Sequence, residues 1–134
     1  MWKCPKCERD FKKKNQSHSC VTYPIEQHFK NKSYSKNLFK KLVKEIEKEV
    51  GKIKIESLPC CIHLVSSYTF SGVWLSKDKL KMDFRVDYQI DSKRIIKQEK
   101  LSTNRDLYYV ELKDEKDIDN ELLKWIKDSY FLDK

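Results

Sequence analysis

Four residues near the N-terminus have the chemical types and the spacing of a zinc site. Cys4 and Cys7 are separated by two residues, and His18 and Cys20 follow after an interval of ten residues. Thiolate and imidazole groups are the ligands that Zn²⁺ prefers, and four of them complete a tetrahedral site with no open position. We therefore predict one structural zinc ion, held by these four residues and unable to activate water. His28 is an alternative to His18 as the imidazole ligand.

Basic side chains occupy the loop between the two halves of this predicted site. Arg9 is followed by Lys12, Lys13 and Lys14, and a bound zinc ion would stiffen the hairpin that carries them. The whole chain has a formal charge of +8 at pH 7, a balance that favours polyanions as partners. The pattern predicts contacts from these four residues to the phosphates of DNA or RNA. A solvated, solubilising loop is the structural alternative.

His63 is the residue of the remaining chain whose surroundings best suit a chemical role. It belongs to an apolar run at residues 60–65. A small-ligand pocket or an active site centred on His63 would use Arg94, Arg85 and Tyr68 as further lining residues. The structural alternative is a histidine that is hydrogen-bonded at the margin of a sheet.

Five cysteines in a reducing compartment do not indicate a disulfide framework. Cys60 and Cys61 are adjacent, and Cα atoms about 3.8 Å apart are too close for ordinary disulfide geometry. We expect two reduced thiols that point to opposite faces of a strand. His63 would share the face of Cys61, as a nucleophile and its base would require, although small core filler is the plainer role for such a thiol.

Several enzyme classes lack their motifs in this chain. With only two glycines, Gly51 and Gly72, the chain has neither a glycine-rich phosphate loop nor a dinucleotide fingerprint. The serine-hydrolase elbow and the two-histidine zinc-protease motif are also missing. The sequence favours a non-enzymatic binding protein with a nucleic acid or another protein as partner. It contains no run of 18 apolar residues and opens without a signal-peptide pattern, so we expect a cytoplasmic protein.

The elements that position these residues fall into three regions: a zinc ribbon at 1–20, a connector at 21–33 and a body at 34–134. A helix is expected from Ser33 or Ser35 to Gly51, and a second helix begins near Asp114. Period-two patterns predict strands between them, at 53–55, 60–65, 68–75, 80–90, 94–101 and 106–112. Short connections leave no room for crossover helices. The expected fold is α+β, an antiparallel sheet with both helices on one face.

Aromatic residues in these strands have two readings. Tyr68, Trp74, Tyr108 and Tyr109 would stack bases if they lay on an open sheet face, or fill the core if they faced the helices.

The Cys/His block, read with the residues around it, resembles a bacterial family. Trp2 to Cys7 and Asn15 to Cys20 carry the N-terminal part of the likeness; the rest is scattered over single positions (Phe11, Ile62, His63, Phe70, Arg94, Ile95, Asp117, Ile118, Asp119, Leu122, Leu123, Lys124, Trp125 and Tyr130). In that family a zinc ribbon precedes domain of unknown function 5655. The resemblance implies the zinc site, the two-part architecture, a bacterial cytosolic setting, and characteristic positions at His63 and Arg94. It implies no activity, and the histidine it leads us to expect is replaced here by the Tyr108–Tyr109 segment.

Overall fold

The computed structural model describes residues 2–5, 10–11, 13–15 and 23–132. Near the N-terminus, β1 (Trp2–Lys3) pairs antiparallel with β2 (Asp10–Phe11). The body opens with the helices α1 (Ile25–Phe29) and α2 (Ser33–Glu49). The remaining elements are β3 (Lys54–Ser57), β4 (Ile62–Val65), β5 (Thr69–Leu75), β6 (Leu80–Val86), β7 (Ile95–Ser102), β8 (Arg105–Leu112), the 3₁₀ helix η1 (Glu115–Asp117) and α3 (Asn120–Phe131).

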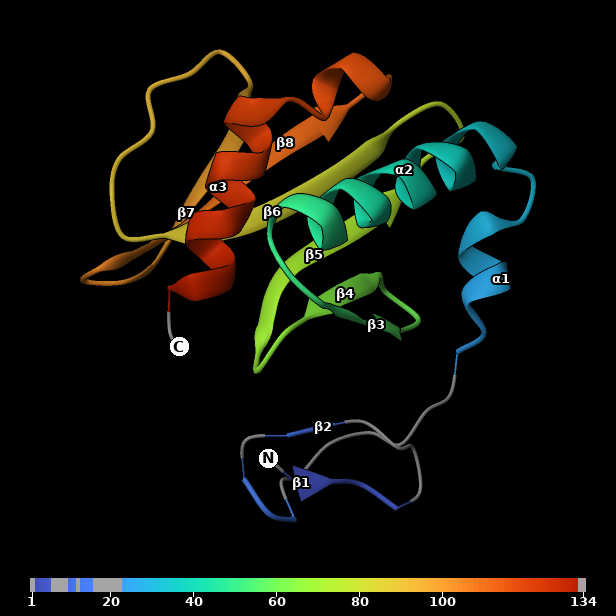
Figure 1. The fold of residues 1–134 in the computed structure, drawn as a ribbon, viewed down its shortest axis with the longest axis horizontal. Helices are drawn as coiled ribbons and strands as arrows, with labels where there is room; N and C mark the ends of the chain where they lie inside the picture. Colours follow the sequence, from blue (N-terminus) through green and yellow to red (C-terminus); the bar gives the residue numbers. More distant parts are fainter. Residues whose placement is uncertain (1, 6–9, 12, 16–22, 133–134) are drawn as a thin grey trace.

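Six strands form one antiparallel sheet in the order β3-β4-β5-β6-β8-β7. Strands that follow one another in the chain pair as hairpins, with one exception. The long connection after β6 leads to β7 at the edge of the sheet, and β8 then lies between β6 and β7. The helices α2 and α3 lie side by side across one face of this sheet (Figure 1). The α+β architecture with an antiparallel sheet is therefore confirmed. No helix in the described part of the chain is long and apolar enough to cross a membrane.

Strict alternation along β6 creates the two faces of the sheet. Its inward side chains are completely buried, whereas its outward side chains are half-buried: the inward set is Leu80, Met82, Phe84 and Val86, and the outward set is Lys81, Asp83 and Arg85. Burying each large apolar side chain contributes about 1.5–3 kcal/mol. The helices supply the other half of the core, for example where the Trp125 ring of α3 stacks on the Phe84 ring, 5.5 Å between centroids.

The closing helix begins later than the sequence indicates. Asp114, where we expected its first turn, instead caps η1, and Asp117 completes a reciprocal capping box there. The chain then restarts at Asp119, whose carboxylate accepts a hydrogen bond from the Leu122 N–H and caps α3. The two acidic caps, Asp114 and Asp119, are five residues apart and gave one apparent start signal in the sequence, because both satisfy the free N–H groups of a helix end.

The ladder between β5 and β6 covers only half of each strand. Backbone pairing runs from Leu75 opposite Leu80 to Val73 opposite Met82. Beyond these pairs, hydrogen bonds from side chains connect the two strands. The Ser129 hydroxyl of α3 donates to the Phe70 carbonyl at 2.8 Å and accepts from the Arg85 N–H at 3.0 Å. We call this half of the β5–β6 junction, from Phe70 to Gly72 on β5 and from Asp83 to Arg85 on β6, the central seam.

Candidate functional site

A groove lies between α1 and α2, and the turn that joins these helices contributes part of its lining. Its volume is about 560 Å³, and its lining residues are Glu26, Phe29, Lys30, Asn31, Lys32, Ser33 and Lys36. Asn31 adopts a left-handed backbone conformation with φ of 58°, which asparagine tolerates better than most residues. This turn sets the two helices apart and brings three lysines to one concavity.

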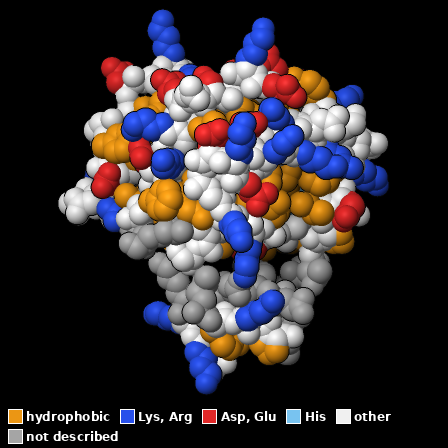
Figure 2. Space-filling model, in the orientation of Figure 1, with side chains coloured by type: hydrophobic (Ala, Val, Ile, Leu, Met, Phe, Trp, Pro, Cys, Tyr) orange, Lys and Arg blue, Asp and Glu red, His pale blue; other side chains and the backbone are white. Residues whose placement is uncertain are grey.

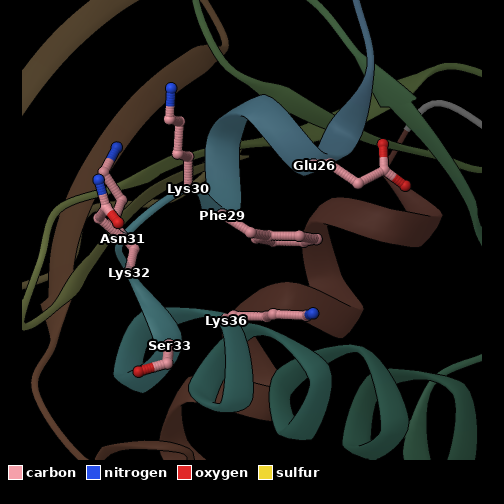
Figure 3. A pocket seen from close by; sticks show the side chains of 7 residues that line it. All are labelled: Glu26, Phe29, Lys30, Asn31, Lys32, Ser33 and Lys36. Carbon is pink, nitrogen blue, oxygen red and sulfur yellow. The ribbon is translucent and has the colours of Figure 1, made fainter.

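Side chains of both helices meet across the groove. The Phe29 ring of α1 lies over Lys36 of α2, with the ammonium nitrogen 5.7 Å from the ring centroid, as Figure 3 shows. Phe29 also contacts the core through Phe39, 5.7 Å between centroids. Lys30 and Lys32 extend from the connecting turn (Figure 3). The groove thus has one aromatic ring in contact with the Lys36 ammonium group, two further lysines at the connecting turn, and Glu26 as the one carboxylate among its lining residues.

The α2 N-terminus adds positive potential to this groove. Lys32 occupies the N-cap position without a side-chain hydrogen bond, and the first turn carries no acidic residue. The free N–H groups at a helix N-terminus carry partial positive charge, so a lysine at the cap is electrostatically unfavourable by itself. An anion in the groove would relieve that repulsion.

Most ligands of the predicted zinc ribbon lie outside the described part of the chain. Cys7, His18 and Cys20 lie outside the described residues, as do Arg9 and Lys12. Cys4 is buried at 4% exposure beside the β1–β2 pair. Within the described residues, no group of three metal-ligating side chains gathers around it or elsewhere.

Two lysines of the predicted ribbon loop are described. Lys13 and Lys14 are both exposed. Basic side chains project from the lower end of the molecule in Figure 2, where the N-terminal segment lies in Figure 1.

His28 has a structural contact of its own. Its Nε2 donates to the Leu58 carbonyl at 2.8 Å, and its ring packs edge-on against Tyr23 at 4.9 Å. Because a carbonyl only accepts, Nε2 carries the proton and is not a free metal ligand in this tautomer. Burial lowers the pKa of His28, the carbonyl contact opposes that shift, and Lys32 adds to it. The hydrogen bond ties the connector to the β3–β4 turn.

The structure divides the aromatic residues considered for base stacking. Tyr68 and Tyr108 are buried in the core. Trp74 and Tyr109 are half-buried on the face that the helices leave uncovered, with ring centroids 6.0 Å apart. Lys81 lies over both rings, at 5.6 Å from Trp74 and 5.1 Å from Tyr109.

Asp83 is the most perturbed carboxylate on that open face. Its Oδ1 accepts the Gly72 N–H at 2.7 Å, and a side chain at Gly72 would contact both carboxylate oxygens. Burial raises the pKa of Asp83 to about 6, against the opposing effects of the Gly72 hydrogen bond and of Arg85. The sequence places Asp83 at one outward position of an alternating strand, and nothing in that pattern predicts that its side chain is partly buried.

The four residues proposed for a pocket do not gather around one cavity. His63 pairs across the sheet with Glu56 on one side and Gly72 on the other. Tyr68 donates to the carbonyls of Ser129 and Tyr130 near the end of α3. The backbone N–H of Arg85 donates to the hydroxyl of the same Ser129. The Nε atom of Arg85 is buried without a hydrogen-bond partner among the described residues.

Arg94 is remote from those three residues. Its guanidinium bonds the Asp119 and Glu121 carboxylates at 2.8 and 3.2 Å and the Asp117 carbonyl at 2.6 Å. Ten helical residues, about 15 Å, separate Asp119 from Ser129. Arg94 therefore fastens the start of β7 to the start of α3, and His63 and Arg94 do not converge.

Cys60 and Cys61 differ from the expectation of thiols on opposite faces of a strand. Strand β4 begins only at Ile62, and the two Sγ atoms lie 2.9 Å apart in the β3–β4 turn. Burial raises the pKa of Cys61 to about 12, and its contacts with Cys60 and the charge of Asp83 add to the shift. A thiol held in its protonated form is a poor nucleophile, which argues against a Cys61–His63 catalytic pair.

Comparison with family models assigns most of the chain. Residues 25–133 match the model described as domain of unknown function (DUF5655). The chain belongs to the DUF5655 family. The DUF5655 domain thus begins at α1 and includes the α1–α2 groove, the whole six-stranded sheet and α3. Searches of curated proteins and of solved structures found no significant match.

Sequence reasoning missed the groove that the DUF5655 domain forms between α1 and α2. The available signal was the spacing of Lys32 and Lys36, which places two ammonium groups one helical turn apart. Lys30 joins them only because of the Asn31 turn, which the sequence did not reveal.

Proposed function

We propose that this protein binds the phosphate backbone of nucleic acid through its basic N-terminal region. The observation that carries the proposal is the α1–α2 groove, which Lys30, Lys32 and Lys36 line together with Phe29, next to a helix N-terminus without a side-chain cap. Ammonium groups and helix N–H groups are the donors that phosphates bind. A half-buried Phe29 ring in the same groove suits the stacking of an unpaired base, so single strands are the favoured ligand.

The distribution of charge supports this location. Residues 1–36 contain nine Lys or Arg and three Asp or Glu, a net charge of +6. Residues 37–134 contain 20 basic and 18 acidic residues, a net charge of only +2. Lysine-rich composition alone would spread the excess over the chain. Its concentration in the first quarter of the sequence favours a local polyanion site.

The ribbon enters the proposal as an extension of the groove. One zinc ion held by Cys4, Cys7, His18 and Cys20 would fold the first twenty residues, since so short a segment buries too little apolar surface to fold alone. Arg9, Lys12, Lys13 and Lys14 would then contact phosphates beyond those in the groove. These contacts position the strand and carry no sequence preference.

Fluorescence anisotropy with labelled single-stranded RNA and DNA, measured at several salt concentrations, tests the groove. We expect the wild-type protein to bind, and the triple variant Lys30→Gln, Lys32→Gln, Lys36→Gln to lose three phosphate contacts. The slope of log affinity against log salt should then fall by about 2. If the wild-type protein and the triple variant bind equally at 1 M salt, a slope change of about 2 means that the variant binds about a hundredfold more weakly at 0.1 M salt.

A matched variant separates a local site from a general charge effect. Lys44→Gln, Lys48→Gln, Lys127→Gln removes the same charge from exposed positions of α2 and α3, and it should keep most of the affinity. Equal losses in both triple variants would reject the groove, and a wild-type protein that does not bind at low salt would reject the function.

A further inference from the structure

The β3–β4 turn holds two thiols together on a rigid support. The Leu58 N–H donates to the Cys61 carbonyl at 2.9 Å, and the Cys61 N–H donates back to the Leu58 carbonyl at 3.2 Å. These reciprocal bonds close a two-residue loop with Pro59 and Cys60 at its tip. His28 adds a third bond, to the same Leu58 carbonyl. Proline fixes its own φ, which limits the backbone motion of this loop.

The two sulfur atoms differ in access but converge in position. Cys60 is exposed and Cys61 is buried, and both are free thiols. Their Sγ atoms lie 2.9 Å apart. A ligand that arrives from solvent meets Cys60 first and finds the second sulfur within bonding reach of the same atom.

We propose that Cys60 and Cys61 form a chelating site for a soft, thiophilic metal or metalloid ion. Two thiolates bound to one atom at about 2.3 Å each, at a tetrahedral angle, lie about 3.8 Å apart. The Cys60–Cys61 pair reaches that separation by opening about 0.9 Å. Soft thiolate ligands select such ions over hard cations.

Direct oxidation to a disulfide is the competing chemistry, and the backbone disfavours it. The sulfurs would have to close to about 2.05 Å, while the Cα atoms of adjacent residues stay about 3.8 Å apart. Ordinary disulfides need a Cα separation of about 4.4–6.8 Å. A bridging atom lengthens the link between the two sulfurs and removes this constraint.

Phenylarsine oxide is a suitable probe, because its trivalent arsenic binds two thiols. Its arsenic–oxygen bonds are replaced by two arsenic–sulfur bonds, the two thiol protons leave with the oxygen as water, and arsenic stays trivalent. The full-length protein, reduced and kept anaerobic, is titrated with the probe and analysed by intact-mass and peptide mass spectrometry. Iodoacetamide labelling then reports which cysteines are protected.

We expect one more phenylarsenic group on the wild-type chain than on Cys60→Ser, with Cys60 and Cys61 in the modified peptide. Cys60 is exposed, so this variant should keep the fold. Any reaction at the N-terminal cysteines is common to both proteins and cancels in the comparison. Loss of chelation should weaken probe binding at this turn by about 10²–10⁴-fold.

A second variant tests the need for two sulfurs. Cys61→Ala retains the accessible thiol of Cys60 and should behave like Cys60→Ser. Equal probe uptake by the wild-type protein and either variant would overturn the proposal. The same holds if iodoacetamide still labels both cysteines of the reduced wild-type protein after the titration.

Discussion

Replacing Asp83 with asparagine should change how stability depends on pH. The pKa of Asp83 is raised from 3.8 to about 6, chiefly by burial. Between these two values the folded protein binds more protons than the unfolded chain, so the free energy of unfolding falls as pH rises. The difference corresponds to about 3 kcal/mol lost between about pH 4 and pH 7.

The Asp83→Asn variant removes this loss because the amide is neutral at every pH. Its side-chain oxygen can still accept the Gly72 N–H that Asp83 accepts at 2.7 Å. At pH 4 the two proteins should have nearly equal stability. At pH 7 the variant should be more stable by up to about 3 kcal/mol.

Urea unfolding, followed by tryptophan fluorescence from pH 4 to pH 8, measures the difference at each pH. The other titratable groups are common to both proteins, so the comparison isolates Asp83. Asp87→Asn is the matched control, since Asp87 is exposed just after the same strand, and it should run parallel to the wild type. Parallel curves for Asp83→Asn and the wild type would show that Asp83 ionises normally and would refute the reasoning.

Two further predictions concern the seam and the ribbon. Ser129→Ala leaves the Phe70 carbonyl and the Arg85 N–H without their bridging hydroxyl, and urea unfolding should show a loss of about 1–3 kcal/mol; no loss would mean that water replaces the hydroxyl. Metal analysis should find about one zinc ion per chain and nearly none in Cys4→Ser, because the proposed site would need all four of its ligands. A purified wild-type protein that contains no zinc would contradict the predicted ribbon.

The sequence predicted the sheet well because alternation is a strong local signal. Leu80, Met82, Phe84 and Val86 repeat with period two, and each is fully buried. Helical spacing likewise placed α2, and its Leu42 and Ile46 are fully buried. These patterns reflect one buried face per element, a property that a segment carries independently of its neighbours.

The sites were harder to predict because they depend on distant segments. The groove needs the left-handed turn at Asn31, and the burial of Asp83 needs a hydrogen bond to Gly72 on another strand. Arg94 suggested a pocket, yet its partners Asp119 and Glu121 lie more than twenty residues away. A sequence pattern does not show which distant residues come into contact. For the same reason it did not show that His63 and Arg94 lie in different parts of the fold.

The central seam also bears on how the DUF5655 domain opens. Backbone hydrogen bonds hold β3, β4 and β5 together on one side and β6, β8 and β7 on the other. Across half of the junction the two groups are joined by the Ser129 hydroxyl, the Asp83 carboxylate and the Ser71 hydroxyl, which donates to the Asp83 carbonyl. Partial unfolding should therefore begin here, and native-state amide exchange should reveal two cooperative halves that separate when the C-terminal end of α3 lifts away.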